Sequence, residues 1–190
     1  MSSSKILKRA GAGILLPAVI FLTTIGIISY NNSITPTGIV IHHSAVPFPA
    51  DNPLDVIAID EIHKRRGYGI FYWGQTYHVG YHYIILPDGT LQPGRPEKCK
   101  GAHAKGFNDY IGICLIGDFS PSDNKNGNKG PQHPTPEQLQ TLEEIVGKLR
   151  KGYDIPLENI RTHKELDAQT ECPGESFPIK DFFERIGKSE

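Results

Sequence analysis

Residues 10–30, AGAGILLPAVIFLTTIGIISY, form an uninterrupted run of 21 residues without a charged side chain. As a helix rising about 1.5 Å per residue, this run matches a hydrocarbon core about 30 Å thick. It exceeds the apolar region of about 7 to 15 residues that is usual in a cleaved signal peptide, and no small-residue cleavage site follows it. The sequence therefore predicts one N-terminal transmembrane helix that acts as a signal-anchor.

The charges on either side of this run predict its orientation. Lys5, Lys8 and Arg9 precede it, which leaves 17 of the 20 basic residues and all 21 acidic residues in the segment 31–190. By the positive-inside rule, residues 1–9 are a cytoplasmic basic segment and the rest of the chain is extracytoplasmic, on the periplasmic or cell-wall side. Two alternatives stay open: a signal peptide that is cleaved before secretion, and a core helix of the domain.

The rest of the chain has the composition of one globular domain. The 190 residues are 38% hydrophobic and 22% charged, with a net charge of -1 and three Cys. Three Cys are too few for a disulfide-rich scaffold, and the near-zero net charge argues against a nucleic acid as partner. We therefore expect a polar linker at 31–37 followed by a single domain, a monomer, at 38–190.

Short apolar runs and helix signals alternate along this domain. Runs rich in β-branched residues predict strands at 38–41, within 80–94, at 111–116 and at 159–162. Start signals at Asn52 and Thr135 and apolar stripes predict helices at 52–67, 135–152 and 179–186. Residues 120–136, rich in Asn, Gly, Lys, Ser and Pro, are expected to be a mobile surface loop. The alternation predicts the α/β class, with a mixed central β-sheet flanked by helices.

Histidines and one cysteine fall where the predicted strands end. His42 and His43 follow the first strand, and His163 follows the last one, nine residues before Cys172. Imidazole and thiolate together suit Zn²⁺, and a third ligand from the first strand would leave one tetrahedral position open, as in catalytic zinc sites. Adjacent strand residues face opposite sides, so only one of the two neighbouring histidines can be a ligand. A buried cysteine and a surface histidine without metal are the other interpretation.

Four ordered segments resemble a known family: IVIHHSA (39–45), VGYHYIILPDGTLQPGR (79–95), GAHAKGFNDYIGICLIGDF (101–119), and RTHKEL with TECPG (161–174). They are similar to the zinc-dependent N-acetylmuramoyl-L-alanine amidases, the family of the T7-lysozyme-like phage enzymes and the peptidoglycan recognition proteins. Because the four segments are spread over most of the domain, the resemblance covers all of it.

The resemblance implies a zinc site at the strand ends, with His42, His163 and Cys172 as ligands and His43 as a packing or supporting residue. Tyr81 matches the family's catalytic tyrosine, although a structural role in a strand is the alternative. Thr170 stands where the phage enzymes have lysine and the catalytic recognition proteins have threonine, so its detailed role stays open.

Three further residues lie in the segment GAHAKGFND, which flanks the substrate groove in the family. His103, Lys105 and Asn108 are therefore expected to contact the glycan or peptide, and a solvated loop is the alternative. His82 is expected to be structural. Cys114 should be a buried thiol, and a disulfide between it and Cys99 is conceivable only outside the cytoplasm.

The implied activity is hydrolysis of the amide bond between the lactyl group of N-acetylmuramic acid and L-alanine. The substrate would be peptidoglycan or its muropeptide fragments, the cofactor Zn²⁺, and the membrane a partner through residues 10–30. A non-catalytic peptidoglycan-binding module is the alternative function. The presence of the implied ligands speaks against that alternative.

Overall fold

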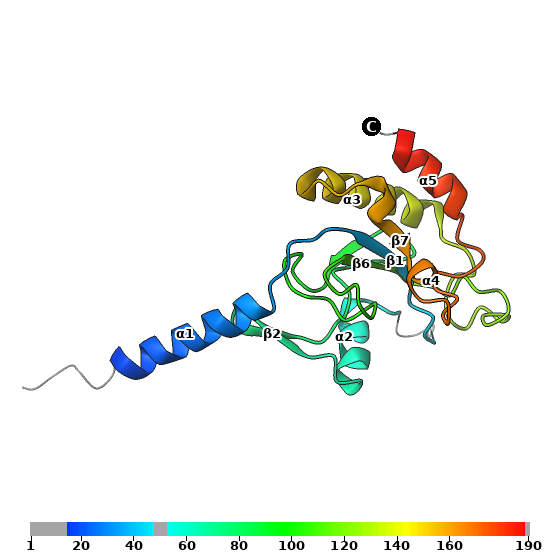
Figure 1. Cartoon of the computed structure of the whole chain (residues 1–190). Helices are drawn as coiled ribbons and strands as arrows, with labels where there is room; N and C mark the ends of the chain where they lie inside the picture. Colours follow the sequence, from blue (N-terminus) through cyan, green and yellow to red (C-terminus); the bar gives the residue numbers. More distant parts are fainter. Residues whose placement is uncertain (1–14, 48–52, 189–190) are drawn as a thin grey trace, which may run out of the picture.

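The computed structural model, which describes residues 15–47 and 53–188, is built around a five-stranded sheet (Figure 1). In spatial order its strands are β5 (Leu91–Pro93), β4 (Tyr83–Ile85), β6 (Ile111–Leu115), β1 (Ile39–His43) and β7 (Ile160–Thr162). β1 is parallel to β6 and β7, β4 is parallel to β6, and β5 is antiparallel to β4. The predicted mixed central sheet is confirmed.

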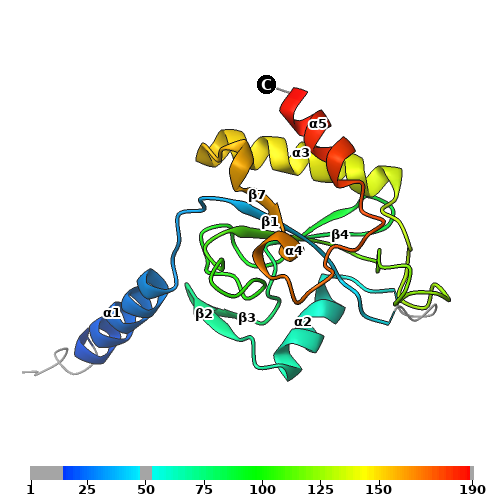
Figure 2. The ribbon, with the colours of Figure 1, turned by 45° about the vertical axis from the view of Figure 1, so that its right-hand side comes forward.

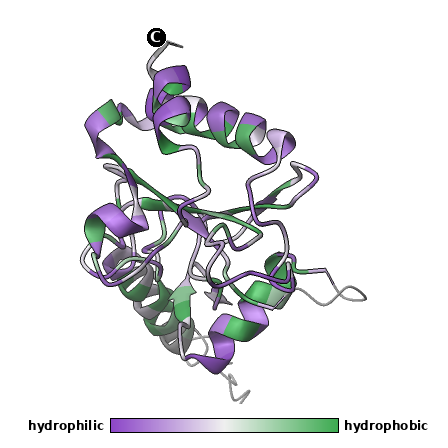
Figure 3. Cartoon of the chain, turned by 90° about the vertical axis from the view of Figure 1, so that its right-hand side faces the viewer, coloured by the Kyte–Doolittle hydropathy of each residue, from purple (hydrophilic) through white to green (hydrophobic). Residues whose placement is uncertain are grey.

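Helices cover both faces of this sheet (Figure 2). α3 (Pro136–Tyr153) and α5 (Ile179–Lys188) lie over one face, and α2 (Val56–Arg65) lies over the other. Figure 3 colours α3 and α5 partly hydrophobic and partly hydrophilic, as expected for amphipathic helices that cover a sheet. The core under α3 and α5 is the larger of two apolar clusters and includes Ile39, Ile41, Ile113, Leu142, Val146 and Phe182. The cluster under α2 includes Ile59, Val79, Ile84 and Cys114.

Alternation along β1 decides where its polar residues lie. Ile39 and Ile41 belong to the cluster under α3 and α5. Because successive side chains of a strand point to opposite faces, His43 shares that face and His42 lies on the face covered by α2. Both histidines are buried. The two neighbours therefore have different surroundings, as the sequence predicts.

The start of α3 is confirmed and that of α2 is not. Thr135 Oγ1 accepts a hydrogen bond from the backbone N–H of Gln138, and the side chain of Gln138 accepts one from the backbone N–H of Thr135, a capping box. α2 begins at Val56, because Asp55 is its N-cap and accepts a hydrogen bond from the backbone N–H of Ala58. The start signal at position 52 lies outside the described residues.

Four short elements were not predicted. β2 (Ile70–Tyr72) and β3 (Gln75–Tyr77) form a hairpin, and a 3-10 turn (Leu157–Asn159) and α4 (His163–Leu166) flank β7. The hairpin turn has positive φ at both central residues, 45° at Trp73 and 90° at Gly74. Strands of three residues are too short to show alternation, and a Trp at positive φ is not a turn signal that sequence rules contain.

α1 (Leu15–Asn31) extends away from the sheet (Figure 1). Its end is attached to the β2–β3 hairpin, because the backbone N–H of Trp73 donates to Ser29 Oγ and the side-chain amide of Asn32 donates to the carbonyl of Phe71, both at 2.8 Å. Large apolar side chains along α1 are exposed, namely Val19, Ile20, Phe21, Leu22, Ile27 and Ile28.

The transmembrane helix predicted at 10–30 is not supported by the described part of the chain. Across residues 15–47 and 53–188, no helix is long and apolar enough to cross a membrane. Residues 10–14, the first part of the predicted segment, lie outside the described residues, as do the basic residues before them.

The segment expected to be a linker is hydrogen-bonded to the domain. The backbone N–H of Ile34 donates to the carbonyl of Lys98, and the backbone N–H of Lys100 donates to the carbonyl of Asn32, both at 2.9 Å. Ser33 pairs with Cys99 as an isolated bridge. Residues 32–34 are thus bonded to the segment 98–100 and belong to the folded domain.

All three cysteines are free and buried, so the conceivable disulfide between Cys99 and Cys114 is absent. Cys114 is fully buried in the cluster under α2, as expected of a structural thiol. Burial raises the pKa of Cys99 to about 11. Both thiols are therefore protonated at neutral pH and act as small apolar side chains.

The long loop of residues 120–136 is folded around a buried side chain. Asn124 is 0% exposed and donates through Nδ2 to the carbonyls of Asp118 and Gly130, at 3.0 and 3.1 Å. Its Oδ1 accepts a hydrogen bond from the backbone N–H of Lys129 at 3.1 Å. These bonds attach the loop to the segment that follows β6.

Candidate active site

Three residues distant in sequence converge at one edge of the sheet. His42 lies at the end of β1, His163 begins α4 directly after β7, and Cys172 lies in the loop after α4. β1 and β7 are parallel neighbours, so their carboxyl ends reach the same edge, where ligands bind in open α/β sheets. One nitrogen of each histidine and the Sγ of the cysteine all lie within 4.8 Å of one another.

The donor set fits a zinc ion. Two imidazoles and one thiolate are ligands that Zn²⁺ prefers, and three protein ligands leave one tetrahedral position open. His42 Nδ1 and Cys172 Sγ are 3.6 Å apart. Tetrahedral zinc with bonds of about 2.05 Å to nitrogen and about 2.3 Å to sulfur requires a separation of about 3.6 Å between those two atoms.

His103 fixes which nitrogen of His42 faces this site. His103 Nε2 lies 3.0 Å from the carbonyl oxygen of Tyr110, which can only accept, so this nitrogen carries the proton. The unprotonated His103 Nδ1 then accepts a hydrogen bond from His42 Nε2, 3.1 Å away. His42 Nδ1 is consequently left with its lone pair directed toward Cys172 Sγ.

Burial sets the protonation of these groups. It holds the pKa of His42 well below the ordinary value, with His103 and His163 nearby as further causes. Burial also lowers the pKa of His163 and of His103, the latter to about 3. It raises the pKa of Cys172 to about 12. Without a cation the imidazoles are neutral and ready to coordinate, whereas the thiol must lose its proton to do so.

Tyr81 lies beside His42 on the face covered by α2. Its ring centroid is 5.2 Å from that of His42 and 5.3 Å from that of His63, a residue of α2. Burial, with Cys114 and Cys172 as further causes, raises the pKa of Tyr81 well above its ordinary value. The phenol therefore stays protonated and can donate a hydrogen bond.

Thr170 holds the loop that carries Cys172. The backbone N–H of Cys172 donates to Thr170 Oγ1 at 3.2 Å. The carbonyl of Cys172 in turn accepts from the backbone N–H of Lys164 in α4, at 2.8 Å. The Thr170 hydroxyl accepts in its bond, so its own proton is not used there.

The residues expected to touch substrate differ in their surroundings. Asn108 Oδ1 accepts from the backbone N–H groups of His103 and Ala104, at 2.9 and 3.2 Å, so it shapes the loop. Both ring nitrogens of His103 are bonded within the protein, as described above. Lys105 is exposed. Substrate contact by these three residues stays a prediction.

Sequence reasoning missed the supporting role of His63. Its Nδ1 accepts from the backbone N–H of Gly80 at 2.8 Å, next to Tyr81. His82, expected to be structural, accepts through Nδ1 from the backbone N–H of Gly112 and donates through Nε2 to the carbonyl of Cys99. The sequence signal that could have indicated this role was the position of His63 on the buried side of the helix predicted at 52–67.

A cleft of about 710 Å³ opens between the end of β1 and α2. Its lining includes Val46, Leu54, Ala58, Ile62 and Arg66. Val46, Ala58 and Ile62 pack against the same apolar cluster as Tyr81. The cleft therefore shares an apolar cluster with Tyr81, although its lining includes neither Tyr81 nor a candidate metal ligand.

Comparisons with known proteins show the family to which this chain belongs. The family model of N-acetylmuramoyl-L-alanine amidases matches residues 32–175. The endolysin of Escherichia phage T7 is 34% identical over 144 residues, which are 75% of this chain and 83% of the phage protein. An N-acetylmuramoyl-L-alanine amidase from Clostridium intestinale is similar in structure, with a TM-score of 0.62, 35% identity, and coverage of 81% of this chain and 87% of that one. The Drosophila protein PGRP-LB has a TM-score of 0.57 and 26% identity, and the match covers 81% of this chain and 80% of that one. This chain thus belongs to the N-acetylmuramoyl-L-alanine amidase family.

Proposed function

We propose that this chain is a zinc-dependent amidase that cleaves the bond between the lactyl group of N-acetylmuramic acid and L-alanine in peptidoglycan or muropeptides. The observation that carries the proposal is the convergence of His42, His163 and Cys172 within 4.8 Å, with Tyr81 beside them. A binding module would need neither an open zinc site nor a protonated phenol next to it.

The proposed chemistry divides between the metal and the chain. Zn²⁺ supplies Lewis acidity toward the amide carbonyl and lowers the pKa of a bound water toward neutrality. His103 keeps the proton on His42 Nε2 and so keeps Nδ1 available as a ligand. Tyr81 is partly buried, and desolvation raises its pKa so that the phenol stays protonated. It is proposed to donate a hydrogen bond to the carbonyl oxygen as negative charge develops there. Such a donor contributes about 3 to 4 kcal/mol to transition-state stabilisation.

Thr170 is proposed as a second donor at the same oxygen. Its hydroxyl accepts from the backbone N–H of Cys172, which leaves its proton to donate. The cleft beside α2 is proposed to hold a part of the substrate, because apolar residues of its wall pack in the same cluster as Tyr81 and Arg66 adds a positive charge to its lining. Lys105, which is exposed in the loop that contains His103, is proposed to contact the substrate.

The direct test combines metal content with product analysis. We expect one zinc per chain and release of new L-alanine N-termini from purified peptidoglycan. Cys172→Ala should abolish both, whereas Cys99→Ala, which removes a buried free thiol outside the candidate ligand group, should preserve both. Peptidoglycan binding without amide cleavage would support the recognition-module alternative. Activity that survives chelation or Cys172→Ala would refute the zinc mechanism.

Membrane attachment is proposed separately, through the uncharged run of residues 10–30. Its support is the exposed apolar surface of α1, which is unusual for a surface in contact with water. Fractionation of cells that express the full chain tests it. Recovery of the uncleaved protein wholly in the soluble fraction would refute this proposal and leave the amidase proposal untouched.

A further inference from the structure

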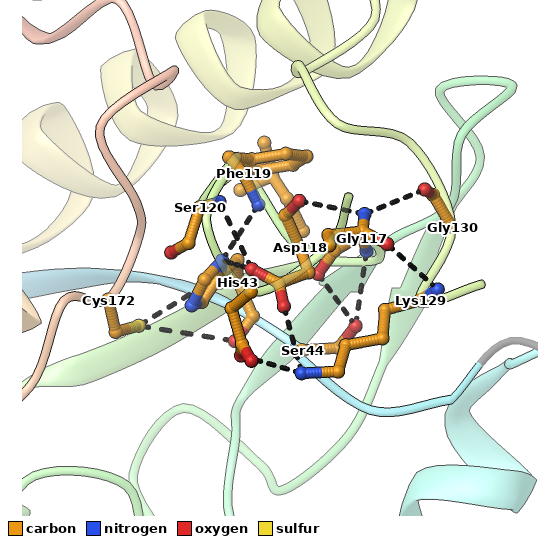
Figure 4. A network of polar contacts seen from close by, with 12 residues as sticks. His43, Ser44, Gly117, Asp118, Phe119, Ser120, Lys129, Gly130 and Cys172 are labelled. Carbon is orange, nitrogen blue, oxygen red and sulfur yellow. Dashed lines mark hydrogen bonds and ion pairs between the residues drawn. The ribbon is translucent and has the colours of Figure 1, made fainter. Parts of the chain in front are cut away.

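A buried carboxylate, that of Asp118, lies beside His43 and therefore on the side of β1 that faces away from His42. Figure 4 shows Asp118 between His43 and Lys129. Asp118 is 0% exposed, and its Oδ1 accepts a hydrogen bond from the backbone N–H of Ser120 at 3.1 Å. Its Oδ2 has no hydrogen-bond partner among the described residues, and Lys129 Nζ lies 3.3 Å from it. The charge of this carboxylate is therefore balanced by one lysine.

His43 does not supply that balancing charge. His43 Nδ1 is 3.5 Å from Asp118 Oδ1, but it accepts a hydrogen bond from the backbone N–H of Phe119 at 3.1 Å. A ring nitrogen that accepts carries no proton. Lys129 is thus the cation that faces Asp118 in Figure 4.

The long loop holds Lys129 in place. The backbone N–H of Lys129 donates to Oδ1 of the buried Asn124 at 3.1 Å, and Lys129 Nζ also bonds Asp123 Oδ2 at 2.6 Å. The lysine side chain is 21% exposed. Its ammonium therefore lies between the buried Asp118 and the exposed Asp123.

The turn that contains Asp118 contacts both chain segments around Cys172. On one side, Phe119 N–H donates to His43, whose own backbone N–H donates to Cys172 Sγ at 3.3 Å. On the other side, the carbonyl of Phe119 accepts from the backbone N–H of Ser176 at 2.9 Å. A Cβ added at Gly174 would lie 2.3 Å from the carbonyl carbon of Phe119, so the two segments are in close contact. A shift of this turn would move the surroundings of Cys172 from both sides.

We propose that Lys129 is a positioning residue for Cys172 in the metal site, acting through the buried Asp118 and the turn at Phe119. The proposal rests on the proposed zinc function and adds a residue that lies outside the ligand set. Removal of the lysine leaves a buried carboxylate without a counter-charge, which is strongly unfavourable in a protein interior. We expect the carboxylate to move toward water and to displace the turn that orients the cysteine.

The test measures metal affinity in the full chain by competition with a chromogenic chelator. Groups that orient metal ligands typically contribute tenfold to a hundredfold to affinity, so we expect Lys129→Met to weaken zinc binding at least tenfold. Lys129→Gln serves as a polar second variant with the same expectation. Lys125→Met, at an exposed position of the same loop, should bind zinc like the wild type.

Two further variants distinguish positioning from general stability. Lys129→Arg should restore zinc affinity, and Asp118→Asn combined with Lys129→Met should recover most of it because both charges are removed together. In cobalt-substituted protein, the thiolate-to-metal absorption band should shift in Lys129→Met and not in Lys125→Met.

The outcomes distinguish a failure of this inference from a failure of the proposed function. Equal zinc affinity in the wild type and Lys129→Met would overturn this inference alone. A loss in the double variant as large as in Lys129→Met would also overturn it, because charge balance would then not be the cause. Absence of zinc binding by the wild type would overturn the proposed function together with this inference.

Discussion

Replacement of His103 by alanine separates two roles for this residue, support of His42 and contact with substrate. In the structure His103 accepts from His42 Nε2 at 3.1 Å and donates to the carbonyl of Tyr110 at 3.0 Å. His103→Ala removes both bonds and frees His42 to adopt the tautomer whose proton sits on the ligand nitrogen. We therefore expect zinc affinity to fall tenfold to a hundredfold, or about 1.4 to 2.7 kcal/mol.

The stability of the metal-free protein should fall as well. Two polar groups lose their partners, and each such loss costs about 1 to 3 kcal/mol when the group stays buried. Because His103 is only half-buried, water can enter, and we expect each of the two groups to cost about 1 kcal/mol, so that the free energy of unfolding drops by about 2 kcal/mol in total. Urea denaturation in the presence of a chelator measures this loss of unfolding free energy separately from metal binding.

Two further variants show whether the loss of zinc affinity comes from the lost hydrogen bond to His42. His103→Asn keeps an acceptor oxygen near the position of Nδ1, so it should recover part of the zinc affinity that His103→Ala loses. Lys105→Ala, two residues away and exposed, should leave zinc affinity unchanged. If His103→Ala bound zinc within twofold of the wild type and raised only KM, the supporting role would be refuted and the substrate-contact role favoured.

Three other predictions concern catalysis, stability and pH. Tyr81→Phe should lower kcat about 100-fold to 1,000-fold with zinc content unchanged. Thr135→Ala removes the N-cap of α3 and should lower the free energy of unfolding by about 1 kcal/mol in urea titration. Burial raises the pKa of Glu97, but hydrogen bonds from Tyr153 and Tyr83 outweigh it and lower the pKa. The wild type should therefore lose stability as pH falls below the unfolded-state pKa of about 4.3, and Glu97→Gln should lose less over that range.

The sequence predicted those parts of the fold in which local signals agree with tertiary structure. The β-branched run at 38–41 is a strand because a parallel strand buried on both faces needs continuous apolar residues. Thr135 and Gln138 predicted the start of α3 because the capping box is a local arrangement. The hairpin at 70–77 has no such local signal, and its strands are stabilised by pairing with each other and by contact with α1.

The candidate ligands could be proposed from the sequence, and the residues that support them could not. Metal ligands are restricted to a few residue types, so His42, His163 and Cys172 were accessible as candidates from the sequence and the family resemblance, and the structure brings them together. The role of His103 depends on which ring nitrogen faces the carbonyl of Tyr110, a fact of three-dimensional placement. Sequence spacing contains no information on that choice.

One strand end connects the two supports of the site. His42 and His43 point to opposite faces of β1, yet both contact Cys172: His42 through Nδ1 at 3.6 Å and His43 through its backbone N–H at 3.3 Å. The first is oriented by His103 on the face of α2, and the second by Phe119 on the face of α3. A slip of one residue in β1 would exchange these faces and disrupt both contacts together. The pairing of β1 with parallel strands on both sides is therefore as necessary to the candidate metal site as its proposed ligands.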